Sequence, residues 1–217
     1  MSRTLALLLL AACGSTPEQD TELPPADVPP EGVEHEHPYT TEHQFPEGGE
    51  THEGLPADPG EGRTTGTPSY TPYQHATLRI DHGNQVILVD PVADAFGEDG
   101  PPKADLVLVT DIHGDHLSVD TILAAAKGDT LVVAPQEAAN RFSPELGSVV
   151  MANGDTQTLR GVGIEAIPMY NHTRGPEEGV LFHDKGRGNG YILTIGGQRV
   201  YLSGDTACTG EMKALER

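Results

Sequence analysis

Residues 105–116 read Asp-Leu-Val-Leu-Val-Thr-Asp-Ile-His-Gly-Asp-His, and this stretch decides both the fold and the chemistry that the sequence predicts. Its first half, residues 105–110, is a run of Leu and Val that is typical of a strand buried on both faces of a sheet. Four potential metal ligands follow within the next six residues, namely Asp111, His113, Asp115 and His116. Because Gly114 lets the loop fold tightly at a strand end, we expect these side chains to converge on a small volume.

Strand-like and helix-like runs continue on both sides of this stretch. Residues 75–80 and 85–90 are expected to pair as a hairpin around a turn that contains Gly and Asn. A helix is expected over residues 118–127, with Ser118 as its N-cap and Gly128 as its stop. The alternation of buried strands with helices predicts an α/β layered sandwich. Further expected elements are strands at 130–134, 163–169, 191–195 and 199–203, and helices at 136–141 and from 209 onward.

The composition of the chain changes near residue 70. Residues 14–69 are rich in Pro, Gly, Glu and Thr, with Phe45 as their only Phe. Such a segment buries too little apolar surface to offset the entropy of ordering it, so we expect a disordered acidic linker over residues 14–69 and one folded domain over residues 70–217. The formal net charge of −20 leaves no basic stripe to neutralise phosphates, which argues against a nucleic-acid partner.

Residues 1–13 have the pattern of a secretory signal, with Arg3 before a short apolar run. The run is far shorter than the ~20 residues that cross a bilayer. Its end, Leu10-Ala11-Ala12-Cys13, resembles the lipobox of bacterial lipoproteins, which implies that Cys13 is lipidated. We therefore expect a protein of the bacterial cell envelope, periplasm-facing or on the outer membrane, that touches the membrane only through a lipid anchor. The alternative is a cytosolic protein with an apolar start.

The ligand-rich loop also carries a family resemblance. Residues 110–116 resemble the His-x-His-x-Asp-His signature of the metallo-β-lactamase superfamily, with Asp111 in the place of the first His. Two further motifs follow in the order of that family, each after an expected strand: His172 in Tyr-Asn-His-Thr, and Asp205 in Ser-Gly-Asp-Thr. Residues 182–190 resemble a stretch found in the lactonase-like branch of the superfamily.

The resemblance covers residues 70–217 and implies a particular fold. That fold is the metallo-β-lactamase-type αββα sandwich. The family supplies one more His ligand from a later strand, whereas this chain stops at Arg217 inside an expected helix. We therefore expect the domain to be incomplete at its C-terminus.

The resemblance also implies metal ligands. The first divalent metal would be held by Asp111, His113 and His172, and the second by Asp115, His116 and Asp205. Asp205 would be shared between the two metals, and Asp115 would in addition orient an attacking metal-bridged hydroxide, which makes it the candidate catalytic residue. Zn²⁺ is the expected metal. The hard oxygen of Asp111 in place of an imidazole makes Mn²⁺ or Fe²⁺ the alternatives.

Four residues near these motifs are candidate substrate contacts, namely His75, His183, Arg187 and Asn189. Arg174, Lys185 and Arg187 would suit an anionic small-molecule substrate, or would simply offset nearby carboxylates. We expect a hydrolase that acts on an ester, a lactone or a phosphoester. The alternative is a non-catalytic periplasmic metal-binding lipoprotein, which would use this loop together with four His residues of the linker, His35, His37, His43 and His52.

Overall fold

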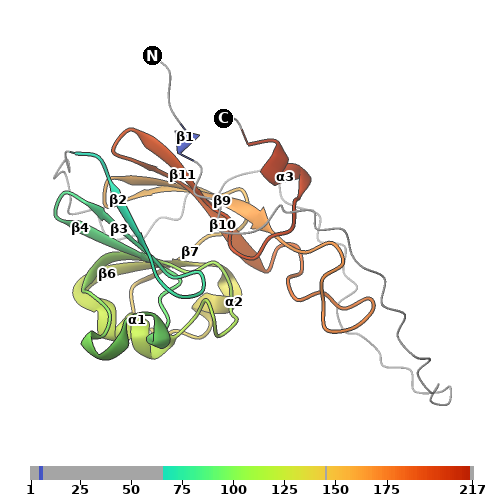
Figure 1. The fold of residues 1–217 in the computed structure, drawn as a ribbon, viewed down its shortest axis with the longest axis horizontal. Coiled ribbons are helices and arrows are strands. Elements are labelled where there is room, and N and C mark those ends of the chain that lie inside the picture. Colours follow the sequence, from blue (N-terminus) through green and yellow to red (C-terminus); the bar gives the residue numbers. More distant parts are fainter. Residues whose placement is uncertain (1–4, 7–65, 145, 216–217) are drawn as a thin grey trace. The chain divides into compact units, whose positions relative to one another are not determined.

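The computed structural model describes residues 5–6, 66–144 and 146–215, and the described strands form two sheets (Figure 1). The first sheet contains β1 (Leu5–Ala6), β8 (Thr156–Leu159), β9 (Val162–Met169), β10 (Gly188–Ile195) and β11 (Gln198–Leu202), in the order β1-β11-β10-β9-β8. The second contains β2 (Ser69–Pro72), β3 (Leu78–His82), β4 (Gln85–Val89), β5 (Ala104–Leu108), β6 (Ala126–Ala134) and β7 (Ser148–Val150), in sequence order.

The second sheet changes from antiparallel to parallel pairing at β4. Strands β2, β3 and β4 pair antiparallel, whereas β4, β5, β6 and β7 pair parallel. Parallel pairing needs crossover connections. These contain the 3₁₀ turns η1 (Ala93–Ala95) and η2 (Gly97–Asp99) and the helices α1 (Val119–Ala125) and α2 (Gln136–Ala139). The carboxyl ends of β4 and β5 therefore lie side by side at one edge of the sheet.

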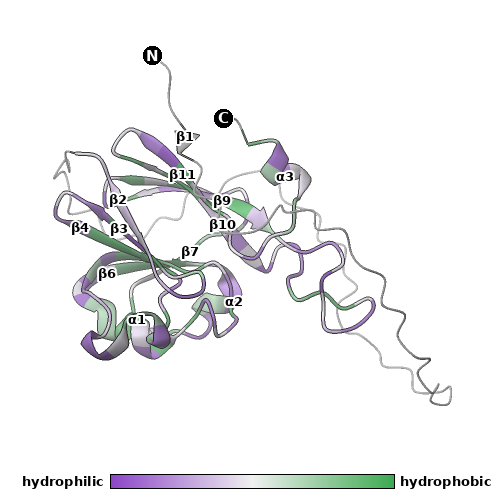
Figure 2. Cartoon of the chain, in the orientation of Figure 1, coloured by the Kyte–Doolittle hydropathy of each residue, from purple (hydrophilic) through white to green (hydrophobic). Residues whose placement is uncertain are grey.

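The Leu and Val run of β5 faces two cores. Leu106 and Leu108 belong to the cluster between the two sheets, which also includes Tyr191 of β10. Val107 belongs to a second cluster with Ile122 of α1, on the other face of the same sheet. Successive strand residues point to opposite faces, so one continuous apolar run supplies both clusters. The hydrophobic colouring in Figure 2 is accordingly strongest on strands such as β4, while the turns are hydrophilic.

The expected α/β sandwich is confirmed. Two sheets pack face to face, helices α1 and α2 lie against the outer face of the second sheet, and α3 (Gly210–Lys213) lies beside β9 of the first (Figure 1). Full burial of each Leu or Val in these clusters contributes roughly 1.5–3 kcal/mol. Four short strands, β1, β2, β7 and β8, were not predicted, because each is only two to four residues long.

The predicted end of the helix at Gly128 is wrong. Helix α1 begins after the Ser118 N-cap, as expected, but it ends at Ala125, and Gly128 lies inside β6. The cause is pairing with β5. Ala126 already pairs with Ala104, and Thr130 donates a hydrogen bond from its Oγ1 to the carbonyl of Ala104 at 2.6 Å. Tertiary strand pairing has thus taken over the last residues of the predicted helix.

The leader and linker lie outside the described residues, except for the two residues of β1 and the last four residues of the linker, 66–69. Strand β1 pairs parallel with β11. The predictions for Cys13 and for the linker His residues fall on parts of the chain that the structure does not describe. Among the described helices, none has the length and apolar character that a membrane crossing requires.

Candidate metal centre

The sheets bring the ends of five strands to one edge. In the first sheet β10 runs antiparallel to both β9 and β11, so the start of β10 lies beside the ends of its two neighbours. In the second sheet the ends of β4 and β5 meet at the same edge. The backbone N–H of Asn189 in β10 donates to the carbonyl of Thr110 at 2.9 Å, which joins the two sheets there. The loops that follow carry most of the candidate residues.

One ligand group consists of Asp115, His116 and Asp205. One ligand atom from each residue lies within 4.8 Å of the others. Nε2 of His116 lies 3.5 Å from Oδ1 of Asp205 and 3.8 Å from Oδ2 of Asp115. The side chain of His116 is 1% exposed, whereas those of Asp115 and Asp205 are 50% and 37% exposed. This group, which we call the second group, unites the three residues that the sequence assigned to the second metal.

A buried carboxylate supports His116 from behind. Oδ2 of Asp90 lies 2.9 Å from Nδ1 of His116 and accepts a hydrogen bond of 2.6 Å from Oγ1 of Thr110. Burial opposes a charged imidazole, but the hydrogen bonds to Asp205 and Asp90 outweigh it and raise the pKa of His116 to about 11. Asp90 directs the other ring nitrogen, Nε2, toward the ligand group, as the partners of metal-binding His residues do.

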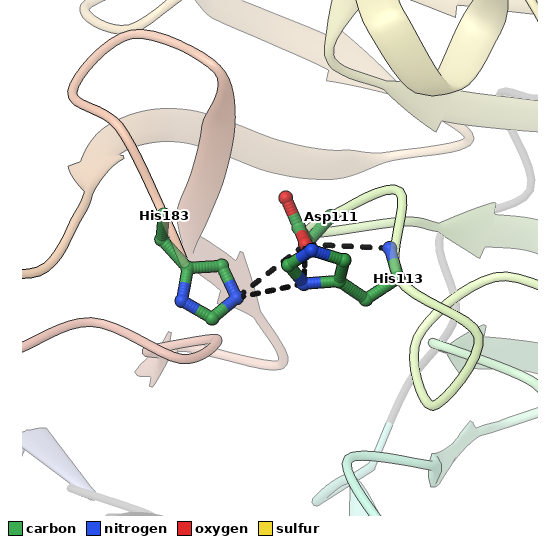
Figure 3. Close-up of side chains that lie close together, drawn as sticks. All are labelled: Asp111, His113 and His183. Carbon is green, nitrogen blue, oxygen red and sulfur yellow. Dashed lines mark hydrogen bonds and ion pairs between the residues drawn. The ribbon is translucent and has the colours of Figure 1, made fainter. Parts of the chain in front are cut away.

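The other group, the first group, consists of Asp111, His113 and His183 (Figure 3). Nδ1 of His113 lies 2.7 Å from Oδ2 of Asp111 and 3.1 Å from Nε2 of His183. The His183 ring reaches the group from the loop before β10, whereas Asp111 and His113 come from the loop after β5 (Figure 3). Asp111 and His183 are buried, and the side chain of His113 is 38% exposed.

A guanidinium lies beside the first group. Nη2 of Arg187 is 3.4 Å from Oδ1 of Asp111, and it also donates to the carbonyl of Phe182. Burial works to raise the pKa of Asp111. The neighbouring His183 and the charges of Arg187 and His113 prevail and lower the pKa of Asp111 to about 2. Asp111 is therefore held as a carboxylate.

Two sequence-predicted residues lie apart from both groups. His172 is exposed, and its ring packs edge-on against Tyr170 with 5.4 Å between ring centroids. Asn189 is buried, and its Nδ2 donates to the carbonyl of Met151 at 2.7 Å. In the structure His183, and not His172, lies with Asp111 and His113. The side chain of Asn189 is hydrogen-bonded inside the fold and does not face either group.

The Asp205 loop approaches the Asp111 loop closely because Gly204 has no side chain. Gly204 has φ = +54°, and a Cβ there would lie 2.4 Å from Sδ of Met169 and 3.2 Å from Cβ of Thr110. Left-handed backbone and close approach both favour Gly at this position. Gly204 thus lets Asp205 come within reach of His116.

His75 lines a cleft to which Gly114 of the loop 111–116 also contributes. The cleft has a volume of about 290 Å³ and is lined by His75, Val92, Ala93, Asp94, Gly114, Leu117 and Ser118. His75 is exposed and has φ = +55°, which is uncommon for a residue other than Gly and is often found at functional sites. Gly114 lies between His113 of the first group and Asp115 of the second in the chain, so the cleft is lined by the chain neighbour of one residue from each group.

Both groups have the donor chemistry of divalent metal sites. The first offers one carboxylate and two imidazoles, and the second offers two carboxylates and one imidazole. Mixed oxygen and nitrogen donors suit Zn²⁺, Mn²⁺ and Fe²⁺. The residues present therefore fit two divalent metals.

Three supporting residues were missed by the sequence reasoning. Asp90 could have been found as a charged residue that ends an apolar strand run. Thr110 and Asn171 carry no signal in the sequence beyond their positions beside predicted ligands, because their roles depend on partners 20 and 12 residues away.

Known proteins resemble this chain in sequence and in fold. A family model described as a beta-lactamase superfamily domain matches residues 70–217. A UPF0173 metal-dependent hydrolase of Thermococcus kodakarensis is 34% identical over 149 residues, which cover 64% of this chain and 61% of the relative. A solved structure of a proposed metal-dependent hydrolase from Parabacteroides distasonis is 40% identical, with a TM-score of 0.61 over 69% of this chain and 66% of that one.

A more distant structure has the same fold. A metallo hydrolase from Ignicoccus hospitalis is 20% identical, with a TM-score of 0.50 over 67% of this chain and 64% of that chain. The chain spans 61–64% of the length of the first curated relatives that it matches. The family match nevertheless covers more than half of the chain, and the two sheets and their loop edge have the corresponding fold. The chain therefore belongs to the metallo-β-lactamase superfamily.

Proposed function

We propose that this chain is the metal-binding part of a metal-dependent hydrolase that acts on an ester, a lactone or a phosphoester. One observation carries the proposal. Two carboxylate–imidazole groups, drawn from the loops after β5 and β11 and the loop before β10, lie at one edge of the fold. Relatives whose names describe metal-dependent hydrolases support it.

The proposed ligands are those of the two groups. Asp111, His113 and His183 would hold one cation, and Asp115, His116 and Asp205 the other. Two divalent cations would polarise the scissile carbonyl or phosphoryl group and make water acidic enough to react at neutral pH. Zn²⁺ is our first expectation, with Mn²⁺ and Fe²⁺ as alternatives, because the donors are mixed oxygen and nitrogen.

Asp115 is the proposed catalytic residue. It is the most exposed member of the two groups, and it is the neighbour of Gly114, which lines the cleft. A half-exposed carboxylate at this place can accept a hydrogen bond from the attacking water and orient it, as general-base groups do. We expect Asp115→Asn to lower kcat more than metal content, since the amide keeps an oxygen for the cation.

The cleft suggests an uncharged substrate. Among the described residues, Lys185 is paired with Glu211 and Arg187 with Asp111, so these cations are already engaged. The cleft instead presents His75, Ser118 and apolar side chains, and its only acidic lining residue is Asp94. We therefore favour a neutral ester or lactone over a phosphoester, with His75 as a substrate contact.

A substrate panel tests this proposal. The metal-loaded full chain would be assayed with p-nitrophenyl acetate, a γ-lactone and bis(p-nitrophenyl) phosphate, before and after dialysis against EDTA. We expect hydrolysis of the neutral substrates that EDTA abolishes and Zn²⁺ restores. Tight metal binding without any turnover would instead favour the non-catalytic alternative.

A matched pair of variants tests the ligand assignment. His183→Ala should lower Zn²⁺ affinity more than about 100-fold, beyond the 10–100-fold typical of outer partners, whereas His172→Ala should leave it within about twofold. Both changes remove one imidazole from the same connecting loop, so metal content measured by mass spectrometry compares the two directly. An equal loss from both variants, or a larger loss from His172→Ala, would reject the assignment of His183.

Lipid anchoring at Cys13 remains a proposal from the sequence. Labelling of the expressed protein with radioactive palmitate, compared between the wild type and Cys13→Ala, tests it. The lipid-anchor proposal requires label in the wild type only.

A further inference from the structure

Asn171, just after the end of β9, contacts residues of both ligand groups with one side-chain amide. Its Oδ1 lies 2.8 Å from Nδ1 of His183, and its Nδ2 donates to the backbone carbonyl of Asp205 at 2.9 Å. The backbone N–H of Asn171 also donates to the carbonyl of His183 at 2.9 Å. Asn171 is only 4% exposed, so these bonds are shielded from water.

The carbonyl of Asp205 fixes which way the amide faces. A backbone carbonyl can only accept hydrogen bonds, so the NH₂ of Asn171 must point toward Asp205 and its Oδ1 toward His183. An amide oxygen also only accepts. Nδ1 of His183 must therefore carry the proton and donate it to Oδ1, and in the neutral ring Nε2 keeps its lone pair.

That lone pair faces both ligand groups. Nε2 of His183 lies 3.5 Å from Oδ2 of Asp111 in the first group and 3.9 Å from Oδ2 of Asp205 in the second. A metal binds only an unprotonated ring nitrogen. The tautomer that Asn171 selects is therefore the one in which His183 can act as a ligand.

We propose that Asn171 is a positioning residue that couples the two groups, because it holds His183 in its Nδ1-protonated tautomer by way of the Asp205 carbonyl. The proposal rests on the metal-binding part of the proposed function. A shift of the Asp205 backbone changes the donor contact of Asn171 and thereby the orientation of His183. The second group thus controls how well the first can bind its cation.

Two variants separate the two halves of the amide. Asn171→Asp keeps an oxygen for His183 but has no donor for the Asp205 carbonyl. Asn171→Leu has a similar size and loses both bonds. The matched control is Gln85→Leu, because the amide of Gln85 also donates to one backbone carbonyl, that of Arg160, at 3.0 Å. Arg160 precedes β9, at the strand end opposite to Asn171, so this control leaves the ligand groups untouched.

Two measurements on the full chain test the proposal, one of the His183 tautomer and one of the Zn²⁺ affinity. In the metal-free protein, ¹⁵N chemical shifts of labelled His report which nitrogen of His183 is protonated, and competition with a chromogenic chelator gives the Zn²⁺ affinity. We expect the wild type, Gln85→Leu and Asn171→Asp to keep the Nδ1-protonated tautomer. Asn171→Leu should lose it and bind Zn²⁺ about 10–100-fold more weakly, the range for partners of metal ligands.

The outcomes distinguish this proposal from the proposed function. An unchanged tautomer in Asn171→Leu overturns the positioning role, and so does a changed tautomer with unchanged Zn²⁺ affinity. Wild-type protein that shows the tautomer pattern but binds no Zn²⁺ overturns the proposed function instead. If Asn171→Leu does not fold by circular dichroism, Asn171→Ala takes its place: it must lose the Nδ1-protonated tautomer and bind Zn²⁺ more weakly than Gln85→Leu does.

Discussion

The two ligand groups use the same types of donor in different electrostatic surroundings. The second group contains two carboxylates, Asp115 and Asp205, around His116. The first contains only one carboxylate, and Arg187 lies 3.4 Å from it, so their formal charges cancel. A metal binds only after Nε2 of His116 has lost its proton, and a cation in the second group then meets two carboxylates, whereas a cation in the first group meets a net charge near zero.

The groups also differ in how firmly their ligands are held. The ring of His116 is fixed by Asp90, which is fully buried and also accepts a hydrogen bond from the backbone N–H of Thr110 at 2.7 Å. The ring of His113 is partly exposed and has no comparable partner behind it among the described residues. Charge and preorganisation therefore both predict that the second group binds its cation more tightly and fills first.

The largest expected effect comes from Asp205, which lies near both groups. Asp205→Ala should lower the affinity of the second group more than about 100-fold, because it removes a ligand and one of two negative charges. Calorimetric titration with Zn²⁺ would measure it. Asp129→Ala is the control, because it removes an exposed carboxylate that pairs with Arg160. Tight Zn²⁺ binding in Asp205→Ala would contradict the prediction that the second group binds its cation more tightly than the first.

The next effect concerns the support of His116. Asp90→Asn keeps the shape of the side chain but removes the charge behind the imidazole, so we expect Zn²⁺ affinity of the second group to fall about 10–100-fold. Asp105→Asn is the matched control, because Asp105 lies at the opposite end of β5 and accepts a hydrogen bond from Val86. A similar loss in both variants would mean that stability, and not the orientation of His116, was lost.

The smallest expected effect is a gain of affinity in the first group. Arg187→Gln removes the cation beside Asp111, so the affinity of the first group should rise roughly fivefold, for about 1 kcal/mol of repulsion, and this gain should shrink at high salt. Arg199→Gln, which removes the partner of Glu165 on the first sheet, should change nothing. Unchanged or weaker Zn²⁺ binding in Arg187→Gln would contradict the inference that the charge of Arg187 weakens cation binding by the first group.

The sequence assigned to the metals residues that follow strands, and it gave His183, which precedes a strand, the role of a substrate contact. Asp111, His113, Asp115, His116 and Asp205 all follow β5 or β11. His183 precedes β10, so a rule that looks for metal ligands after strands selects His172 as the third member of the first group, where the structure groups His183 with Asp111 and His113. Because β10 is antiparallel to β9 and β11, its start lies at the edge where theirs end. Only the direction of the strand reveals this.

By itself the sequence determined the strand that both cores share and the loop that carries four candidate ligands. The reason is that the Leu and Val alternation of residues 105–110 and the spacing of residues 111–116 are local properties of the chain. Tertiary structure alone decided that His183 joins Asp111, that Asp90 supports His116 and that Asn171 links His183 to Asp205. These contacts join residues 12 to 72 positions apart, and strand pairing and packing, which no local pattern encodes, bring them together.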